Sequence, residues 1–288
     1  MPRPRRSLPD RFTPHPQARL IGPDGHPAEA APDLATDTPA TIADTPCTAA
    51  ITAALHRAAL GLPFRIGAPD LPPPGPGRRP AFETLTSGST GTPRRIRRSQ
   101  RSWCASFAVN ARLFSITPGT RTAVLGRMVH SLSLYGALEG ACLGAETHLL
   151  AALRPDAQHR ALADRAVEIL YATPAQLRLL AETAGTPLPA LRLILVGGSK
   201  LDATLRAALA ALAPRAEIRE FYGAAEASFV TLTDRDTPEG SVGRPYPGVT
   251  LEIRDAGGTP LPPMPWARSG SDPPISATAT PTAATFPR

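Results

Sequence analysis

The spacing of apolar positions from residue 81 onward alternates between two patterns. Apolar runs of about four to eight residues are typical of buried strands, and apolar residues three or four positions apart are typical of helices. The runs predict strands at 81–86, 122–126, 147–151, 168–172, 191–197 and 216–222. The segments between them predict helices at 99–114, 133–143, 157–167, 174–184 and 202–212. This alternation predicts an α/β fold: a mostly parallel sheet layered with helices on both faces, with the functional site at the loops.

The first 80 residues follow neither pattern, apart from one segment. Pro, Ala, Asp and Thr dominate up to about residue 45, which predicts irregular structure. Apolar residues recur at helical spacing from Thr48 to Leu62, and the run LPPPGPGRRP at 71–80 then interrupts the chain. We therefore predict an irregular Pro-rich N-terminal region with one helix at 1–80, a core at 81–263 and an unstructured tail at 264–288.

Composition excludes several classes of protein. With 42% hydrophobic residues and a net charge of +7, the chain can bury a core. Three cysteines without a CxxC pair exclude a disulfide or zinc scaffold. The sequence predicts neither a membrane span nor a secretory signal, so the cytoplasm is the expected location. Lys200 is the only lysine among 31 basic residues, so this arginine-rich charge says little about nucleic acid.

The densest chemical signal reads TSGSTGTPR and follows the first predicted strand. Its two glycines allow the backbone to turn so that several N–H groups point at one anion, while hydroxyls and an arginine add donors and charge. The chain has no Gly-Lys-Ser/Thr triplet, which excludes the loop of P-loop NTPases. The segment predicts a phosphate-binding loop, with a solvated connecting loop as the alternative. The candidate ligands are Thr86, Ser87, Gly88, Ser89, Thr90, Gly91, Thr92, Pro93 and Arg94.

This loop resembles the phosphate loop of adenylate-forming enzymes, the family of AMP-binding acyl-CoA synthetases, peptide-synthetase adenylation domains and luciferases. The family loop reads S/T-S-G-S/T-T-G-x-P-K, and Arg94 stands in place of its lysine. Further matches follow in the family's order: GRMVHSLSLYG around His130, LYATPAQLRLL around Pro174, LILVGGSKL at 193–201, FYGAAE at 221–226 and GSVGRPYPGVTLEIRD at 240–255. The resemblance covers about 80–263.

The resemblance implies a role for each matched residue. Tyr222 would stack on adenine, Gly223 would let the nucleotide approach the backbone, and Glu226 would be a catalytic residue that holds Mg²⁺. His130 would be the second catalytic residue, beside the acyl pocket; a satisfied core histidine is the alternative. Four further positions would bind the nucleotide: Gly197, Gly198, Ala224 and Ala225. Ala225 replaces a family hydroxyl that donates to the α-phosphate.

The resemblance also implies an activity, that of an AMP-forming acid–thiol ligase. Such an enzyme uses ATP and Mg²⁺ to activate a carboxylic acid as an acyl-adenylate and passes the acyl group to coenzyme A, or to a carrier-protein thiol. An inactive nucleotide-binding remnant is the alternative, because the family's ribose aspartate, hinge arginine and small C-terminal domain are not matched. A third hypothesis is an arginine-rich nucleic-acid-binding protein. We do not favour it, and we expect no nucleic-acid partner. The oligomeric state stays open.

The tail after Pro263 suggests why the resemblance stops there. The sequence Met-Pro-Trp-Ala at 264–267 forces Ala and then Gly in the shifted reading frame. With permitted wobble bases, that frame reads AVGEIWVRSPDLGYGD, which is the continuation that the resemblance predicts. Our hypothesis is that a single-base frameshift replaced the remainder of the large domain and the C-terminal domain by an unrelated tail; resequencing this stretch tests it.

Other residues receive no role in catalysis or binding. Lys200 follows a Gly-Gly turn and does not match the family's catalytic lysine, so we predict a surface residue. Cys104 is predicted to pack rather than react. Five histidines are not spaced along the chain as metal ligands are: His15, His26, His56, His148 and His159. Five arginines are predicted at the start of the helix after the loop, as a solvated face near an anion site: Arg94, Arg95, Arg97, Arg98 and Arg101.

Overall fold

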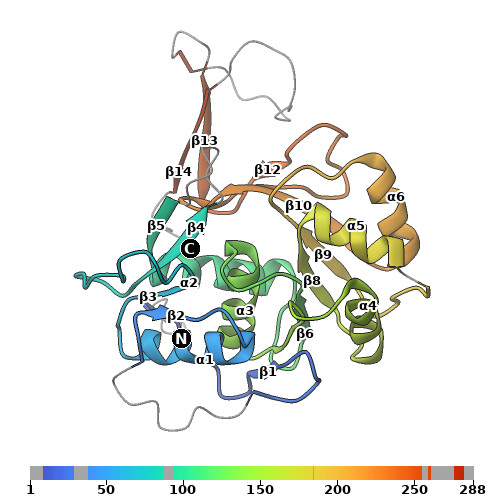
Figure 1. Cartoon of the computed structure of the whole chain (residues 1–288). Coiled ribbons are helices and arrows are strands. Elements are labelled where there is room, and N and C mark those ends of the chain that lie inside the picture. The colour runs from blue at the N-terminus through green and yellow to red at the C-terminus, as the bar shows by residue number, and fades with distance from the viewer. Residues whose placement is uncertain are drawn as a thin grey trace, which may run out of the picture.

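The main sheet forms the centre of the protein. The computed structural model describes residues 9–28, 38–86, 94–183, 185–254, 259–260 and 276–281. In these residues, eight strands are ordered β1-β7-β6-β8-β9-β10-β11-β12 (Figure 1). Neighbours from β1 to β10 are parallel, and β11 and β12 add an antiparallel edge. The strands are β1 Arg19–Ile21, β6 Arg121–Val124, β7 Glu146–Leu149, β8 Ile169–Ala172, β9 Leu193–Val196, β10 Glu217–Ala224, β11 Ser228–Leu232 and β12 Arg244–Pro245.

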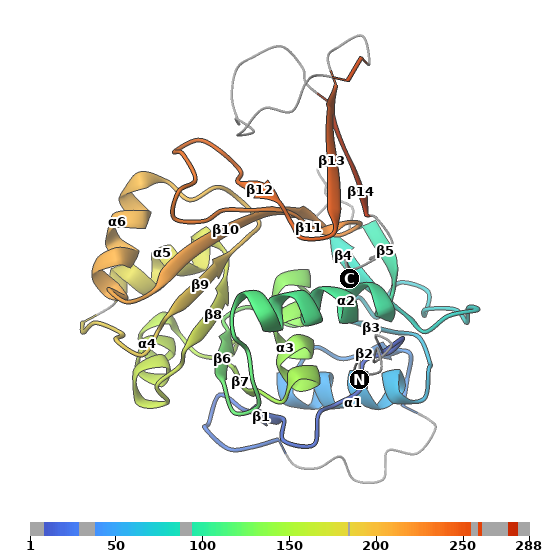
Figure 2. The same ribbon diagram turned by 180° about the vertical axis from the view of Figure 1, so that it is seen from behind.

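Each face of this sheet has its own core, because successive strand residues point to opposite sides. On one face, α4 (Pro155–Asp164), α5 (Pro174–Thr183) and α6 (Ala203–Leu212) cover a core that, among the described residues, contains only Ala, Val, Leu and Ile. We call this the aliphatic face. On the other, α3 (Ser131–Leu143) packs on β6, β7 and β8, and α2 (Gln100–Leu113) packs on α3. Its core is rich in Phe, Tyr and Trp, and we call it the aromatic face. Figure 2 shows these helices on opposite sides of the sheet.

A second, four-stranded sheet adjoins the aromatic face. Its order is β2 (Thr41–Ile42), β3 (Phe64–Ile66), β4 (Ala81–Thr86) and β5 (Arg94–Ser99). Helix α1 (Cys47–Ala59) packs against β3 and α3. The structure corrects the expectation of irregular structure before residue 80, because β1, β2 and β3 lie there and Phe12 is fully buried. These strands have only two or three residues each, too few to show a period in the sequence.

The predicted α/β class is confirmed, together with its predicted elements. The helix predicted at 48–62 is α1, and the five helices predicted after residue 81 are α2 to α6. The six predicted strands are β4 and β6 to β10. Strongly periodic segments specify their own secondary structure, so these are the elements that a sequence reveals.

Two segments differ from the prediction. Arg94, Arg95, Arg97 and Arg98 lie in strand β5, not at a helix start; six register pairs with β4 outweigh the missing apolar alternation. In the tail, where the sequence predicts no element, β14 (Ser276–Pro281) pairs antiparallel with β13 (Val249–Arg254) (Figure 1). Backbone pairing requires no apolar pattern, so nothing in the sequence indicated β14. The core boundary at residue 263 stays a prediction.

Candidate functional site

The two ends of the predicted phosphate loop are held side by side. Thr86 ends β4, Arg94 begins β5, and the two residues are paired across the antiparallel ladder. The Arg94 side chain is exposed. Residues Ser87 to Pro93 lie outside the described residues, so their contacts with phosphate stay a prediction. The structure therefore defines the stem of this loop.

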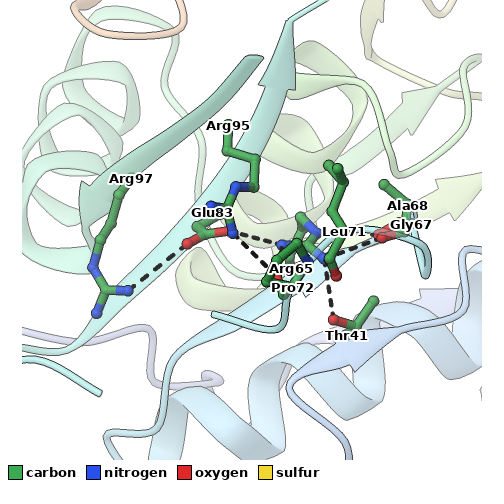
Figure 3. Close-up of polar contacts among 9 residues, drawn as sticks. All are labelled: Thr41, Arg65, Gly67, Ala68, Leu71, Pro72, Glu83, Arg95 and Arg97. Atoms are coloured by element: carbon green, nitrogen blue, oxygen red, sulfur yellow. Dashed lines mark hydrogen bonds and ion pairs between the residues drawn. The ribbon is translucent and has the colours of Figure 1, made fainter. Parts of the chain in front are cut away.

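A buried arginine anchors the stem (Figure 3). Arg65 of β3 is fully buried, and its guanidinium donates to Glu83 Oε2 at 2.9 Å. Its other acceptors are a hydroxyl and four carbonyl oxygens: Thr41, Gly67, Ala68, Leu71 and Pro72. Arg95 and Arg97 lie 4.0 and 3.8 Å from the same carboxylate. Breaking a buried ion pair is strongly destabilising, so this cluster fixes β4 three residues before Thr86. Two arginines of the predicted solvated run are thus ion-pair partners.

The turn between β10 and β11 carries the predicted adenine and metal residues. Tyr222 is 56% exposed, which leaves one ring face available to a ligand. A Cβ atom at Gly223 would lie 2.1 Å from the backbone oxygen of Ser228, so only glycine fits there. The register of the β10–β11 pair shifts between Tyr222 and Gly223. The carboxylate of Glu226 is exposed at the end of this turn. The structure thus brings these predicted residues together on one turn.

Two side chains that the sequence analysis did not single out hold this turn. Arg98 of β5 donates through Nη1 to the carbonyl oxygen of Ala225 at 2.7 Å. Trp103 of α2 donates through Nε1 to Ser228 Oγ at 2.9 Å. Burial lowers the pKa of Arg98, and the negative charge of Glu226 acts in the opposite direction. A cation therefore lies near the predicted metal-binding carboxylate. The only sequence signal for Arg98 was its place in the arginine run.

The predicted glycine turn lies against the same strand. A Cβ atom at Gly197 would approach the Phe221 ring to 2.2 Å, so this position requires glycine. Gly198 has φ +98°, in the left-handed region that favours glycine. These two glycines, directly after β9, let the chain pass close to β10; their contact with the nucleotide stays a prediction.

A cavity of about 170 Å³ opens beside this turn. Five of its described lining residues are large and apolar or aromatic: Trp103, Leu132, Tyr135, Phe221 and Phe229. The others are small: Ser131, Gly198, Gly223, Ala224, Ala225 and Ser228. Phe221 lines the cavity, whereas Tyr222, the next residue along β10, does not. Ala224 and Ala225 thus line the cavity and directly precede Glu226, which is exposed.

His130 lies at the rim of this region. It is the N-cap residue of α3, and its backbone forms a bridge with Leu85, next to the start of the loop. Its side chain is exposed, so the alternative of a core histidine is wrong. The following residues, Ser131 and Leu132, line the cavity, whereas His130 is not among the lining residues. A catalytic role for His130 stays a prediction.

A buried polar network lies behind the cavity. Glu139 of α3 is 1% exposed and accepts hydrogen bonds from Tyr171 Oη and from Asn110 Nδ2. Asn110 also donates to Tyr135 Oη at 3.2 Å, and that hydroxyl donates to Ser106 Oγ at 2.8 Å. Burial raises the pKa of Glu139 to about 7, against the lowering effect of these hydrogen bonds. In the sequence, the only signal for this network is that Glu139 is the single charged residue of α3.

The Glu226 carboxylate fits the predicted Mg²⁺. Among the described residues, no three His, Cys, Asp or Glu side chains gather as a metal cluster. Mg²⁺ usually takes one or two carboxylates together with substrate phosphates and water, so a single exposed acid beside a phosphate site is suitable. Lys200 is exposed, as predicted. Cys104 is buried, which raises the pKa of its thiol to about 12 and agrees with a packing role. In the described part of the chain, no helix is long and apolar enough to cross a membrane.

Sequence comparisons relate the chain to known enzymes. A family model described as "AMP-binding enzyme" matches residues 19–267. The uncharacterized acyl-CoA ligase YhfT of Bacillus subtilis is 35% identical over 182 residues, which are 62% of this chain and 38% of the relative. The putative long chain fatty acid-CoA ligase VraA of Staphylococcus haemolyticus is 30% identical over 179 residues, 59% of this chain and 37% of the relative. The chain thus spans well under two thirds of the length of these relatives.

Solved structures share the fold. CmiS6 superposes with a TM-score of 0.63 at 21% identity, covering 77% of this chain and 68% of CmiS6. VinN superposes with a TM-score of 0.60 at 19% identity, covering 83% of this chain and 63% of VinN. The amide bond synthetase McbA from Marinactinospora thermotolerans is 26% identical with a TM-score of 0.54, covering 63% of this chain and 37% of McbA.

Proposed function

The chain belongs to the AMP-binding enzyme family, and on this premise we propose that it binds ATP with Mg²⁺ and activates a carboxylic acid as an acyl-adenylate. The observation that carries the proposal is the β10–β11 turn, which presents an exposed aromatic ring, a glycine that tolerates no side chain and an exposed carboxylate within five residues. An aromatic face suits a flat base, and a carboxylate suits Mg²⁺. The apolar cavity next to the turn suits the rest of the acid.

The proposal gives each region a role. The loop at 86–94 binds the β- and γ-phosphates. Arg94, in the stem of this loop, supplies positive charge. Tyr222 stacks on adenine, and the backbone near Gly197, Gly198, Gly223 and Ala224 lies along the nucleotide. Glu226 would hold Mg²⁺, which would supply positive charge to the phosphate oxygens. Ala225 offers no hydroxyl to the α-phosphate, and the nearby Arg98 supplies positive charge in that region. His130, exposed at the rim, contacts the acyl side of the site.

The proposed reaction has two steps. A carboxylate oxygen of the acid attacks the α-phosphorus of ATP, the bond to the β-phosphate oxygen breaks, and pyrophosphate leaves. A thiol sulfur then attacks the acyl carbonyl carbon, the bond to AMP breaks, and the thiol proton passes to solvent. Coenzyme A is the proposed thiol, because the relatives are named as CoA ligases. A carrier-protein thiol is the alternative, and the cytoplasmic location stays a prediction.

Thermal unfolding of the whole chain with and without Mg·ATP tests the nucleotide site. Ligand at a hundredfold its Kd stabilises the folded state by about 2.7 kcal/mol, which raises the midpoint by several degrees. Glu226→Gln should abolish most of the Mg²⁺-dependent part of this shift. Glu182→Gln, another exposed acid on α5, is the matched control and should keep it. A wild-type midpoint that does not respond to Mg·ATP would contradict the proposal.

Pyrophosphate release separates the enzyme from a nucleotide-binding remnant. Release that requires a carboxylic acid supports the ligase. An ATP-dependent shift without release, over a broad panel of acids, would favour the remnant.

A further inference from the structure

We propose that the acid activated at this site is compact, up to about the size of one aromatic ring, and carries no charge other than its carboxylate. The inference rests on the proposed function and concerns the cavity beside the β10–β11 turn. The cavity measures about 170 Å³. An apolar cavity of about 150 Å³ in another protein holds one benzene molecule, so this space suits one ring or a short branched chain. The tail of a long-chain fatty acid has several times the volume of a short chain and would require the cavity to extend.

The lining explains why a second charge is excluded. Among the described lining residues there is no Asp, Glu, Lys, Arg or His. The polar side chains are the hydroxyls of Ser131 and Ser228 and the edges of Tyr135 and Trp103. The Trp103 indole N–H is already bonded to Ser228, and Tyr135 Oη points into the network behind the wall. A substrate ammonium would lose its hydration there without an opposing charge, which is costly. The cavity therefore selects against amino acids.

Packed rings line one side of the cavity, which we call its floor. The Tyr135 ring lies with its centroid 5.0 Å from that of Trp103 and 5.1 Å from that of Phe229, both in edge-on contact. On the far side of Phe229, Tyr246 stacks on it at 4.9 Å. Phe221 closes the wall against Phe229 with centroids 4.4 Å apart. Such aromatic contacts are favourable beyond the area that they bury, and an alkyl chain would have to separate these rings to pass between them.

The buried network makes this floor hard to open. Moving Tyr135 aside would break its hydrogen bonds with Asn110 and Ser106. Asn110 is also bonded to Glu139, and Tyr246 Oη donates to Asn110 Oδ1 at 2.7 Å. Buried polar groups that lose their partners pay the full desolvation penalty, so displacement of one ring would disturb the whole network. A purely apolar floor could yield to a longer chain by rotamer changes alone, whereas this one is held by polar bonds.

The carboxylate of the acid has one suitable position. Ala224 and Ala225 belong to the small-residue part of the lining, and they directly precede Glu226. An acid with its ring on the floor would therefore present its carboxylate toward the turn that carries Glu226 and Tyr222. This is where the proposed function requires the α-phosphate.

Acyl sulfamoyl adenosines, which mimic acyl-adenylates, test the inference without any need for turnover. Binding to the whole chain is measured by calorimetry for adenosine sulfamate and for its benzoyl, hexadecanoyl and phenylalanyl derivatives. We expect the benzoyl compound to bind at least about tenfold more tightly than the sulfamate. The hexadecanoyl and phenylalanyl compounds should bind less than about threefold more tightly than adenosine sulfamate. Hexadecanoyl or phenylalanyl binding as tight as benzoyl binding would overturn the inference.

The shared nucleoside keeps the two proposals apart. If adenosine sulfamate and Mg·ATP both fail to bind, the proposed function fails. If they bind and the acyl group adds nothing in any derivative, the nucleotide site stands and the inference about the cavity is wrong.

Enlarging the cavity supplies an independent test. Phe221→Ala removes a ring from the wall, so a 2-naphthoyl derivative should gain at least about tenfold relative to the benzoyl derivative. Leu179→Ala, at an exposed position on α5, is the control and should leave the ratio unchanged. If Phe221→Ala does not fold, Phe221→Leu removes part of the same ring and should shift the ratio in the same direction. A ratio that stays at the wild-type value in a folded Phe221 variant would contradict the assigned position of the substrate.

Discussion

On the aliphatic face of the main sheet, α4, α5 and α6 cover a core built from Ala, Val, Leu and Ile, and no predicted nucleotide residue lies in it. On the aromatic face, α2 and α3 enclose rings, a hydrogen-bonded carboxylate and the cavity. Aliphatic side chains pack without directional requirements, so the first core supplies stability alone. The polar network of the second limits how its rings can move. The aliphatic face thus supports the sheet, and the aromatic face shapes the site.

Glu139 and His148 are buried titratable groups on opposite faces, and they differ in their partners. Glu139 on the aromatic face accepts two hydrogen bonds. His148 of β7 is 2% exposed, is in register with Ala123 of the aliphatic core, and neither ring nitrogen has a hydrogen-bond partner. Glu146 lies 3.3 Å from its Nε2, and the charges of Arg165 and Arg121 also act on it. Burial disfavours the charged form of both groups, which is the deprotonated form of Glu139 and the protonated form of His148, so their contributions to stability should change with pH in opposite directions.

Leu209→Ala should have the largest effect on stability. Leu209 of α6 is fully buried in the aliphatic core, and truncation of such a residue costs about 2–5 kcal/mol through lost burial and a cavity. Urea unfolding measures this loss. If the two faces are separate in function, the variant should keep the wild-type ratio of benzoyl to hexadecanoyl binding. A changed binding ratio in a folded variant would show that the aliphatic core also shapes the site.

The sequence predicts the aliphatic half almost completely, and physical reasons explain why. Helices α4, α5 and α6 alternate with β8, β9 and β10 through local, strongly periodic segments. Their cores need only apolar residues of suitable size, so the pattern of the chain is sufficient. The motif at 221–226 was also readable, because its glycine and aromatic residue are adjacent in sequence as well as in space.

The aromatic half was only partly predictable. Its cavity gathers Trp103, Tyr135, Phe221 and Phe229 from four separate elements, and no sequence spacing connects them. Phe12 lies in a segment without a period, yet it is fully buried among these rings. Strand β5 contains mostly arginine and depends on pairing with β4. Tertiary contacts decide such elements, so a single sequence carries little signal for them.

After Leu209→Ala, the next largest effect is expected from Glu139→Gln, which should change the pH dependence of stability. The pKa of Glu139 rises from 4.5 to about 7 on folding, so the folded state binds more protons in that window. Stability from this group is present below about pH 4.5 and is lost as pH rises through about 7, with a cost of about 3 kcal/mol. The variant cannot ionise and should gain on the wild type by about that amount between about pH 4.5 and pH 8. Urea unfolding across this range measures the difference; a constant difference would contradict the assignment.

His148→Leu should show the opposite trend, with an effect of similar size. Burial lowers the pKa of His148 from 6.5 to about 4, partly opposed by Glu146. Below the ordinary histidine pKa the unfolded chain takes up the proton and the folded chain resists it, so stability is lost as pH falls from about 6.5 to about 4. The variant should therefore gain on the wild type toward acid pH, by roughly 3 kcal/mol.

Because these windows overlap with opposite sign, the two contributions largely cancel in the wild type. Each single variant exposes the other group, and the double variant should return to a pH dependence near that of the wild type. If both single variants change in the same direction with pH, the faces do not differ as described.

Arg98→Met should have the smallest effect on stability, and it addresses the site itself. Methionine keeps much of the apolar stem and removes the donor to the Ala225 carbonyl oxygen and the charge near Glu226. One hydrogen bond and a nearby charge correspond to about 1 kcal/mol, so Mg·ATP binding should weaken by about five- to tenfold. Arg160→Met, at an exposed position on α4 beside Asp156, removes an ion pair from the aliphatic side and should leave binding unchanged. Calorimetry on both variants measures the difference. Equal binding by the two variants would show that the β10–β11 turn keeps its geometry without Arg98, and that Trp103 and the strand pairing are sufficient to hold it.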